Sequence, residues 1–129
     1  MRKAEEKKIG KQEVYDFIVL GAGVTGLAAG MYSGRLGLKT LVLGASHGTE
    51  LPVGGVITTT NIVENYPGFI RLTGTELSDK IRDHTLDYKQ FVVIKQEKAE
   101  SVEKKKDLFV VSTKKNIYEG KTILFATGT

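Results

Sequence analysis

Hydrophobic residues along the chain fall into short runs separated by glycine-rich or charged segments. The run from Tyr15 to Leu20 is nearly continuous and contains β-branched and aromatic residues. This pattern is typical of a buried parallel strand, because both faces of such a strand are covered. A helical stretch follows from about Val24 to Leu36, and the run from Lys39 to Leu43 predicts a second short strand. The pattern therefore predicts a strand–helix–strand unit.

The second half of the chain predicts another helix and more strands. Thr73 and Glu76 have capping-box spacing, which predicts a helix start at Thr73 and a helix to about Lys89. Further strands are expected at residues 91–94, 98–103, 108–112, 116–118 and 121–126. The middle three are separated by charged turns and indicate an antiparallel β-meander. We expect a three-layer α/β fold: helices on one face of a central parallel sheet and the meander on the other.

Residues 44–69 keep neither a helical nor a strand period. The segment contains both prolines and five glycines, and a long irregular stretch of this kind is usually functional or disordered. Its hydrophobic residues favour an ordered loop packed on another element: Val56, Ile57, Ile62, Val63, Tyr66 and Phe69. Two simpler interpretations stay open, since residues 58–60 fit a strand edge and residues 65–68 fit an ordinary turn.

A glycine motif stands between the first strand and the first helix. Gly21, Gly23 and Gly26 have the spacing of a dinucleotide-binding turn, and their place in a strand–helix–strand unit strengthens that interpretation. The first glycine permits the tight turn, the second lets a pyrophosphate approach the backbone, and the third packs helix against strand. The helix N-terminus would then bind the phosphates.

One part of this dinucleotide pattern is missing. An Asp or Glu is expected about 20 residues further on, where it would bind the ribose hydroxyls. Here the second strand ends without an acid, and the next acidic residue is Glu50. The ribose contact is therefore expected from the backbone, from Ser46 or from Glu50.

Composition excludes several other functions. The 129 residues include no cysteine and two histidines, His47 and His84, without ligand-like spacing, so we expect neither a disulfide nor a metal site. We interpret His47 as a loop residue and His84 as part of a solvated helix face, and no residue qualifies as a catalytic nucleophile. The net charge of +4 comes largely from residues 1–11 and 104–106, which indicates solvated surface rather than nucleic-acid binding.

The ends of the chain suggest its organisation. Residues 1–13 are polar and alternate in charge, which favours a flexible charged extension and is unlike a signal peptide. No window has the apolar length of a membrane span, so a cytoplasmic protein is the default expectation. Residues 14–129 then form one domain. Thr127-Gly128-Thr129 ends the chain where a turn should start, and we interpret this as truncation.

The chain resembles the N-terminal part of low-molecular-weight thioredoxin reductases. The matching pieces are residues 15–16, the turn at 21–26, the GGVITTT run at 54–60, the VENYPGF run at 63–69 and the Ala-Thr-Gly at 126–128. The resemblance covers nearly everything from Tyr15 to the end. It implies a Rossmann-like FAD/NAD(P)-binding fold, with residues 14–129 as the N-terminal portion of an FAD-binding domain.

The resemblance also implies roles for individual residues. The pyrophosphate would be held at the glycine turn, by Gly21, Ala22, Gly23, Val24, Thr25 and Gly26. The ribityl and flavin side would be lined by Gly55, Val56 and Thr60, with Val56 where the family usually has glutamine. The amide of Asn65 would hydrogen-bond the cofactor. Lys98 and Ala99, at the first meander strand, would lie near adenine, and Ala126, Thr127 and Gly128 would close over the FAD.

The implied parent enzyme passes electrons from NAD(P)H through FAD to a disulfide, with a thioredoxin-like partner and as a homodimer. Its NAD(P)H-binding domain, Cys-x-x-Cys pair and C-terminal FAD segment are absent from this chain, so the chain alone is expected to be inactive. Three alternatives stay open. They are a ferredoxin–NADP reductase of this type, a short nucleotide-binding or partner-binding module completed by another chain, and binding of AMP or ADP alone.

Overall fold

The computed structural model describes residues 13–44 and 53–128. In this part of the chain the strands form two four-stranded sheets, one with order β4-β3-β2-β8 and one with order β1-β7-β6-β5. The elements are β1 (Val14–Tyr15), β2 (Phe17–Leu20), α1 (Val24–Arg35), β3 (Thr40–Leu43), a 3-10 helix η2 (Val56–Thr59), α2 (Gly74–Leu86), β4 (Val92–Lys95), β5 (Ser101–Lys105), β6 (Leu108–Ser112), β7 (Ile117–Gly120) and β8 (Ile123–Phe125).

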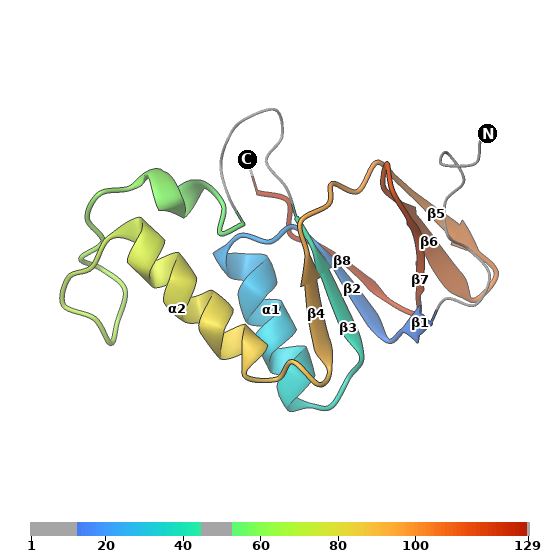
Figure 1. The fold of residues 1–129 in the computed structure, drawn as a ribbon, viewed down its shortest axis with the longest axis horizontal. Coiled ribbons are helices and arrows are strands. Elements are labelled where there is room, and N and C mark those ends of the chain that lie inside the picture. The colour runs from blue at the N-terminus through green and yellow to red at the C-terminus, as the bar shows by residue number, and fades with distance from the viewer. Residues whose placement is uncertain (1–12, 45–52, 129) are drawn as a thin grey trace.

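The first sheet is parallel throughout, with β2 between β3 and β8. Both of its faces are covered, which explains the continuous apolar runs. Ile18 and Leu41 on one face join a core cluster with Val111 and Tyr118 of the second sheet. The opposite face, including Val19, packs against residues of the helical layer. The predicted three-layer fold is confirmed, and Figure 1 shows the helices and the second sheet on opposite sides of the parallel sheet.

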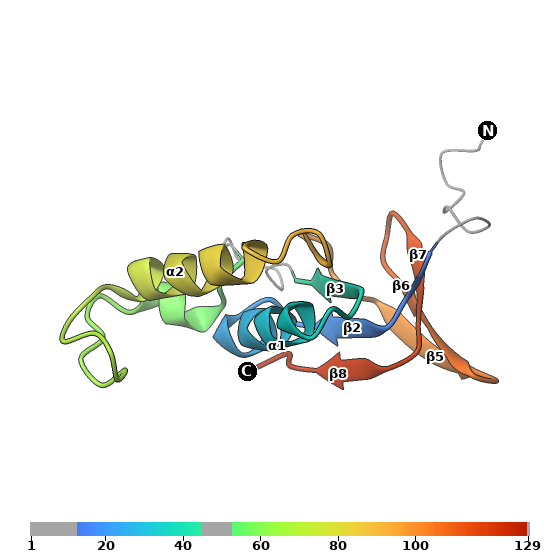
Figure 2. The same ribbon diagram turned by 90° about the horizontal axis from the view of Figure 1, so that it is seen from below.

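Helix α1 lies close to the parallel sheet, and α2 packs on α1. A Cβ added at Gly34 would come within 2.6 Å of a Val92 methyl carbon, so the small residues of α1 set its distance from the sheet. Thr85 of α2 donates a hydrogen bond to the Leu27 carbonyl of α1 at 2.7 Å. The two helices therefore form one layer, joined by a buried hydrogen bond. Figure 2 shows the same ribbon from a second direction.

The predicted first strand is divided at Asp16, so the prediction of one strand over residues 15–20 is wrong. Val14 and Tyr15 pair with β7 in the second sheet, whereas Phe17 onward pairs with β3 and β8. The Asp16 carboxylate accepts from the Lys39 N–H at 2.8 Å, and the Asp16 carbonyl accepts from the Thr122 hydroxyl at 2.6 Å. These bonds fix the bend that lets one segment serve two sheets.

The segment from residue 53 to residue 72 is ordered but less packed than its composition predicts. Residues 56–59 form the 3-10 helix η2, so the strand-edge interpretation of the threonine run is wrong. Val63 is buried and pairs with Leu72. The expectation of packing fails for four side chains that are more than a third exposed: Val56, Ile62, Tyr66 and Phe69.

Helix α2 begins as the sequence predicts. The Glu76 N–H donates to the Thr73 hydroxyl at 3.0 Å, and the Thr73 N–H donates to the Glu76 carboxylate at 2.8 Å. This capping box satisfies two N–H groups at the helix start. Leu77 and Thr85 of this helix are buried.

Candidate functional site

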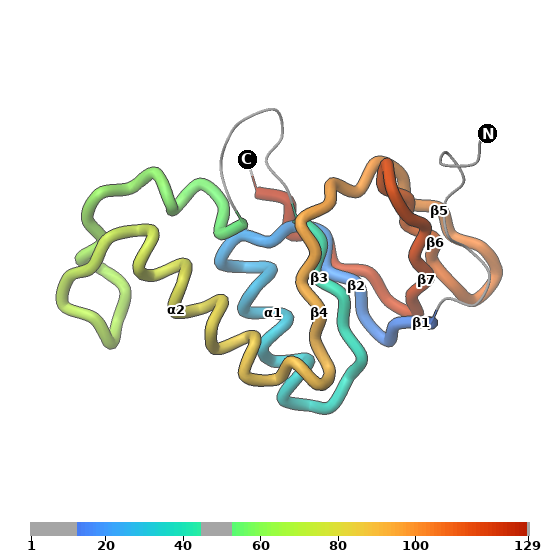
Figure 3. The backbone as a smooth tube through the Cα atoms, viewed as in Figure 1, coloured from blue at the N-terminus to red at the C-terminus, as the bar shows by residue number. Residues whose placement is uncertain are grey.

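The four parallel strands end at one edge of the sheet, where the chain leaves β2, β3, β4 and β8 on the same side (Figure 3). Ligands of open parallel sheets bind outside this carboxyl edge. Here the Gly21 N–H donates to the Leu43 carbonyl at 2.7 Å, and the Gly44 N–H donates to the Lys95 carbonyl at 3.1 Å. The glycine turn, the end of β3 and the end of β4 are therefore tied together.

Two of the three motif glycines are required by the packing of the protein itself. Gly21 has φ +125°, and a Cβ there would overlap the Ala126 carbonyl oxygen. A Cβ at Gly26 would overlap the Gly21 carbonyl oxygen and come within 3.2 Å of Val19 Cγ1. The turn, the first helical turn and the residue after β8 thus meet without room for a side chain.

The middle glycine is different. Gly23 has φ −82° and ψ −170°, an extended conformation that any residue can adopt. A Cβ there would lie 3.6 Å from Gly55 Cα, which is an ordinary contact. Nothing in the described protein requires glycine at this position. Glycine here leaves the backbone open to close approach by a ligand such as a pyrophosphate.

The start of α1 lacks the caps that α2 has. Among the described residues no side chain caps the N-terminus of α1, and its first turn contains no acidic residue. The first N–H groups of any helix have no intrahelical acceptor, and the helix dipole places partial positive charge there. The open backbone at Gly23 and the uncapped helix start together fit a phosphate-bearing ligand.

The structure brings three of the predicted segments together at this point. The Gly54 N–H donates to the Ala22 carbonyl at 2.7 Å, and the Ala126 N–H donates to the Leu20 carbonyl at 2.8 Å. Gly55 has φ +77°, and a Cβ there would lie 3.0 Å from Gly23 Cα. The predicted site residues at 21–26, 55 and 126 are therefore neighbours.

The remaining predicted residues lie further along the segments that leave this point. Val56 is 55% exposed, Thr60 and Asn65 are exposed, and Thr127 and Gly128 are exposed after Ala126. The side chains of Thr60 and Asn65 make no hydrogen bond within the part of the chain that is described. Ser46, His47 and Glu50, including both candidate ribose contacts, lie outside the described residues.

Lys98 and Ala99 are not in the first strand of the meander, as predicted, because β5 begins only at Ser101. They lie in the link between β4 and β5, directly after the carboxyl edge of the parallel sheet. The Glu97 N–H donates to the Lys95 carbonyl at 2.9 Å, which turns the chain there. Ala99 packs against the core cluster between the two sheets.

Glu97 is a polar centre that the sequence did not indicate. Its carboxylate accepts hydrogen bonds from Thr113, Asn116 and Tyr118. Burial raises the pKa of Glu97, but these three donors and the charge of Lys95 outweigh it and hold that pKa below its ordinary value. Burial and donation to Glu97 raise the pKa of Tyr118. The four residues are scattered over residues 97–118 without a motif, so no sequence pattern could have revealed the cluster.

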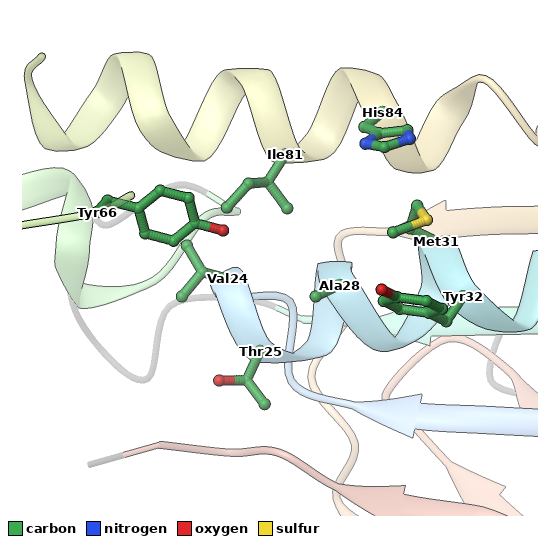
Figure 4. A pocket seen from close by; sticks show the side chains of 8 residues that line it. All are labelled: Val24, Thr25, Ala28, Met31, Tyr32, Tyr66, Ile81 and His84. Carbon is green, nitrogen blue, oxygen red and sulfur yellow. The ribbon is translucent and has the colours of Figure 1, made fainter. Parts of the chain in front are cut away.

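A groove of about 460 Å³ lies between α1 and α2. Figure 4 shows the side chains that line it: Val24, Thr25, Ala28, Met31, Tyr32, Tyr66, Ile81 and His84. It is mainly apolar and meets the glycine turn only at the first residues of α1. His84 is exposed, as its predicted place on a solvated helix face requires.

Two negative findings apply to residues 13–44 and 53–128. No group of three or more His, Asp or Glu side chains is placed there to hold a metal ion. Nor does that part of the chain contain a helix with the length and apolar character needed to cross a membrane.

The parallel sheet, the glycine turn at its carboxyl edge and the uncapped helix start define a dinucleotide-binding domain of the Rossmann type. A comparison with protein families agrees with that class. The chain belongs to the pyridine nucleotide-disulphide oxidoreductase family, whose model matches residues 15–129.

Individual relatives are similar along nearly the whole chain. A 34.2 kDa protein of the rubredoxin operon of Clostridium pasteurianum is 38% identical over 128 residues, covering 96% of this chain and 36% of that protein. Thioredoxin reductase of Mycoplasma pneumoniae is 34% identical over 122 residues, covering 91% and 35%. The structure of thioredoxin reductase from Streptococcus pyogenes superposes with a TM-score of 0.81 at 29% identity, covering 89% and 35%. The chain thus spans about a third of the length of these relatives.

Proposed function

We propose that this chain binds FAD through its glycine turn, as the FAD-binding part of a thioredoxin reductase-like flavoprotein. The observation that carries the proposal is the open backbone at Gly23 beside the uncapped start of α1. Membership of the pyridine nucleotide-disulphide oxidoreductase family favours FAD over AMP or ADP alone as the ligand. When bound, FAD supplies electron transfer between a pyridine nucleotide and a disulfide.

The chain's own residues hold the cofactor in this proposal. The N–H groups at the start of α1 bind the pyrophosphate, and Gly23 leaves the space for it. Gly55, Val56, Thr60 and Asn65 line the path toward the flavin. Lys98 and Ala99 lie on the adenine side, and Ala126, Thr127 and Gly128 close the site.

The activity of the whole protein is a further part of the proposal. NAD(P)H as electron donor, a thioredoxin-like disulfide protein as acceptor and a homodimer are the assignments that the thioredoxin reductases among its relatives support. We assign the chain itself no catalytic residue, because its sequence contains no cysteine. A cytoplasmic location stays a prediction.

Titration of the purified chain with FAD tests the proposal, followed by flavin absorbance and fluorescence. The matched variant is Gly23→Ala, whose backbone conformation suits alanine and whose Cβ meets only ordinary contacts. We expect the wild type to bind FAD and the variant to bind at least about tenfold more weakly, equivalent to about 1.4 kcal/mol. The variant's melting temperature should change little. Equal affinity of the two proteins would contradict the assignment of the pyrophosphate to this turn.

A further inference from the structure

The Glu97 carboxylate joins the β4–β5 link to the tip of the β6–β7 hairpin. Both of its oxygens lie 3.0 Å from the Tyr118 hydroxyl, and Thr113 Oγ1 lies 2.8 Å from one of them. Asn116 Nδ2 lies 3.1 and 3.2 Å from the two oxygens. Three donors therefore converge on one ionised acceptor, and hydrogen bonds to charged groups are stronger than neutral ones.

The hairpin that supplies these donors is itself fixed. The Thr113 hydroxyl accepts from the N–H groups of Lys115 and Asn116, both at 3.0 Å, and the Thr113 N–H donates to the Asn116 carbonyl at 2.9 Å. Thr113 is 1% exposed. Glu97 is thus attached to a rigid turn rather than to a mobile loop.

The link has a second attachment to the same hairpin. The Glu100 N–H donates to the Ser112 carbonyl at 2.7 Å, one residue before the turn to which Glu97 is bound. Lys98 and Ala99 lie between the two attachments. With both ends of this two-residue stretch bonded to one hairpin, its backbone has little freedom to move along the sheet edge.

We infer that Glu97 is a positioning residue for the adenine side of the cofactor site: it fixes the Lys98–Ala99 backbone at the carboxyl edge of the parallel sheet without touching the ligand. The inference rests on the proposed function, which places the ADP part of FAD at this edge. Lys95 connects the two regions, because its carbonyl accepts from both Gly44 and Glu97.

Removal of the Glu97 carboxylate should change the affinity for ADP in opposite directions, depending on whether Glu97 acts through its charge or through positioning. FAD and ADP are anions, so a nearby carboxylate disfavours their binding through space, and its removal would strengthen binding if charge alone mattered. A positioning role predicts the reverse, because the Lys98–Ala99 backbone loses one of its two attachments.

The test compares Glu97→Ala with Glu100→Ala in the full chain. Both variants remove one carboxylate from the same link, but the Glu100 side chain makes no hydrogen bond within the described residues. We measure dissociation constants for ADP by calorimetry and for inorganic pyrophosphate by NMR. We expect Glu97→Ala to weaken ADP binding about tenfold and to leave pyrophosphate binding unchanged. Glu100→Ala should bind ADP as well as the wild type or slightly better.

Conservative variants keep the inference testable if Glu97→Ala does not fold. Glu97→Gln retains part of the hydrogen bonding, and Tyr118→Phe removes a single donor, so each should weaken ADP binding by a smaller factor, about two- to fivefold. Circular dichroism establishes folding for each variant.

Three outcomes would overturn the inference. ADP affinity unchanged in folded Glu97 variants would remove the positioning role while leaving the proposed function intact. An equal loss for ADP and pyrophosphate would show a general structural effect rather than one on the adenine side. A wild-type chain that binds neither ligand nor FAD would contradict the proposed function itself, and the positioning role with it, before any variant is compared.

Discussion

The two sides of the candidate site are built very differently. On the phosphate side, the glycine turn is enclosed by the ends of β3 and β8 and by Gly54, and added methyl groups at Gly21 or Gly26 would overlap backbone atoms. On the side assigned to the flavin, residues 56–70 are mostly exposed. They are attached mainly to α2 and its start, as in the hydrogen bond from the Gly74 N–H to the Thr60 carbonyl at 2.9 Å.

The difference shows which part of the ligand this chain can hold with its own structure. A preorganised site binds without the cost of ordering its residues, whereas an exposed segment must be ordered by the ligand or by another element. We therefore expect the ADP part of FAD to contribute most of the binding energy, with a smaller contribution from the flavin side.

The largest effect should come from Gly26→Ala, which tests how tightly the phosphate side is packed. Alanine normally favours a helix over glycine by about 1 kcal/mol, but here its Cβ would overlap the Gly21 carbonyl oxygen. We expect a loss of about 3 kcal/mol or more in the free energy of unfolding, measured by urea denaturation. A variant as stable as the wild type would show that the turn can relax. The phosphate side would then not be more tightly packed than the flavin side.

A smaller effect is expected from Asn65→Ala on the flavin side. Because Asn65 is exposed, its removal should leave the melting temperature unchanged. If its amide bonds the cofactor, FAD affinity should fall about fivefold while ADP affinity stays the same. Asn61→Ala is the matched control, since Asn61 is an exposed amide in the same segment. Equal losses in both variants would remove the specific role of Asn65.

The smallest effect concerns acid stability on the adenine side. Since the pKa of Glu97 is held below its ordinary value of 4.5, its stabilising contribution is complete above pH 4.5 and is lost as the pH falls through its pKa in the folded protein. We expect a loss of about 1 kcal/mol or less, because the carboxylate is partly exposed. Urea denaturation at a series of pH values measures it. In Glu97→Ala this loss of stability at low pH should be absent. If both proteins lose the same stability as the pH falls, the loss comes from other carboxyl groups.

Local patterns in the sequence predicted most of the helices and strands, and three of the predicted site segments lie together at the glycine turn. The first helix and the capping box at Thr73 depend on neighbouring residues, and they appear as predicted. The bend at Asp16 could not be predicted in this way, because it depends on partners at Lys39 and Thr122. The Glu97 cluster was missed for the same reason, since its donors come from a distant hairpin.

In the exposed segment at residues 56–70, hydrophobicity predicted more burial than the structure shows. Tyr66 and Phe69 have the hydrophobicity of core residues but lie 42% and 38% exposed, with their ring centroids 6.3 Å apart. Hydrophobicity predicts that such residues are covered by something, but it does not identify what covers them.

The pairing of β2 with β8 also determines when the site can form during synthesis. Ala126, which closes against Gly21, follows that glycine by more than a hundred positions, whereas β3 and α1 follow within a few tens of residues. When only β2, α1 and β3 have emerged from the ribosome, the glycine turn still lacks its contact with Ala126. Long-range pairing of this kind forms late, because the intervening loop must close first. The glycine turn therefore closes only after β8 has left the ribosome.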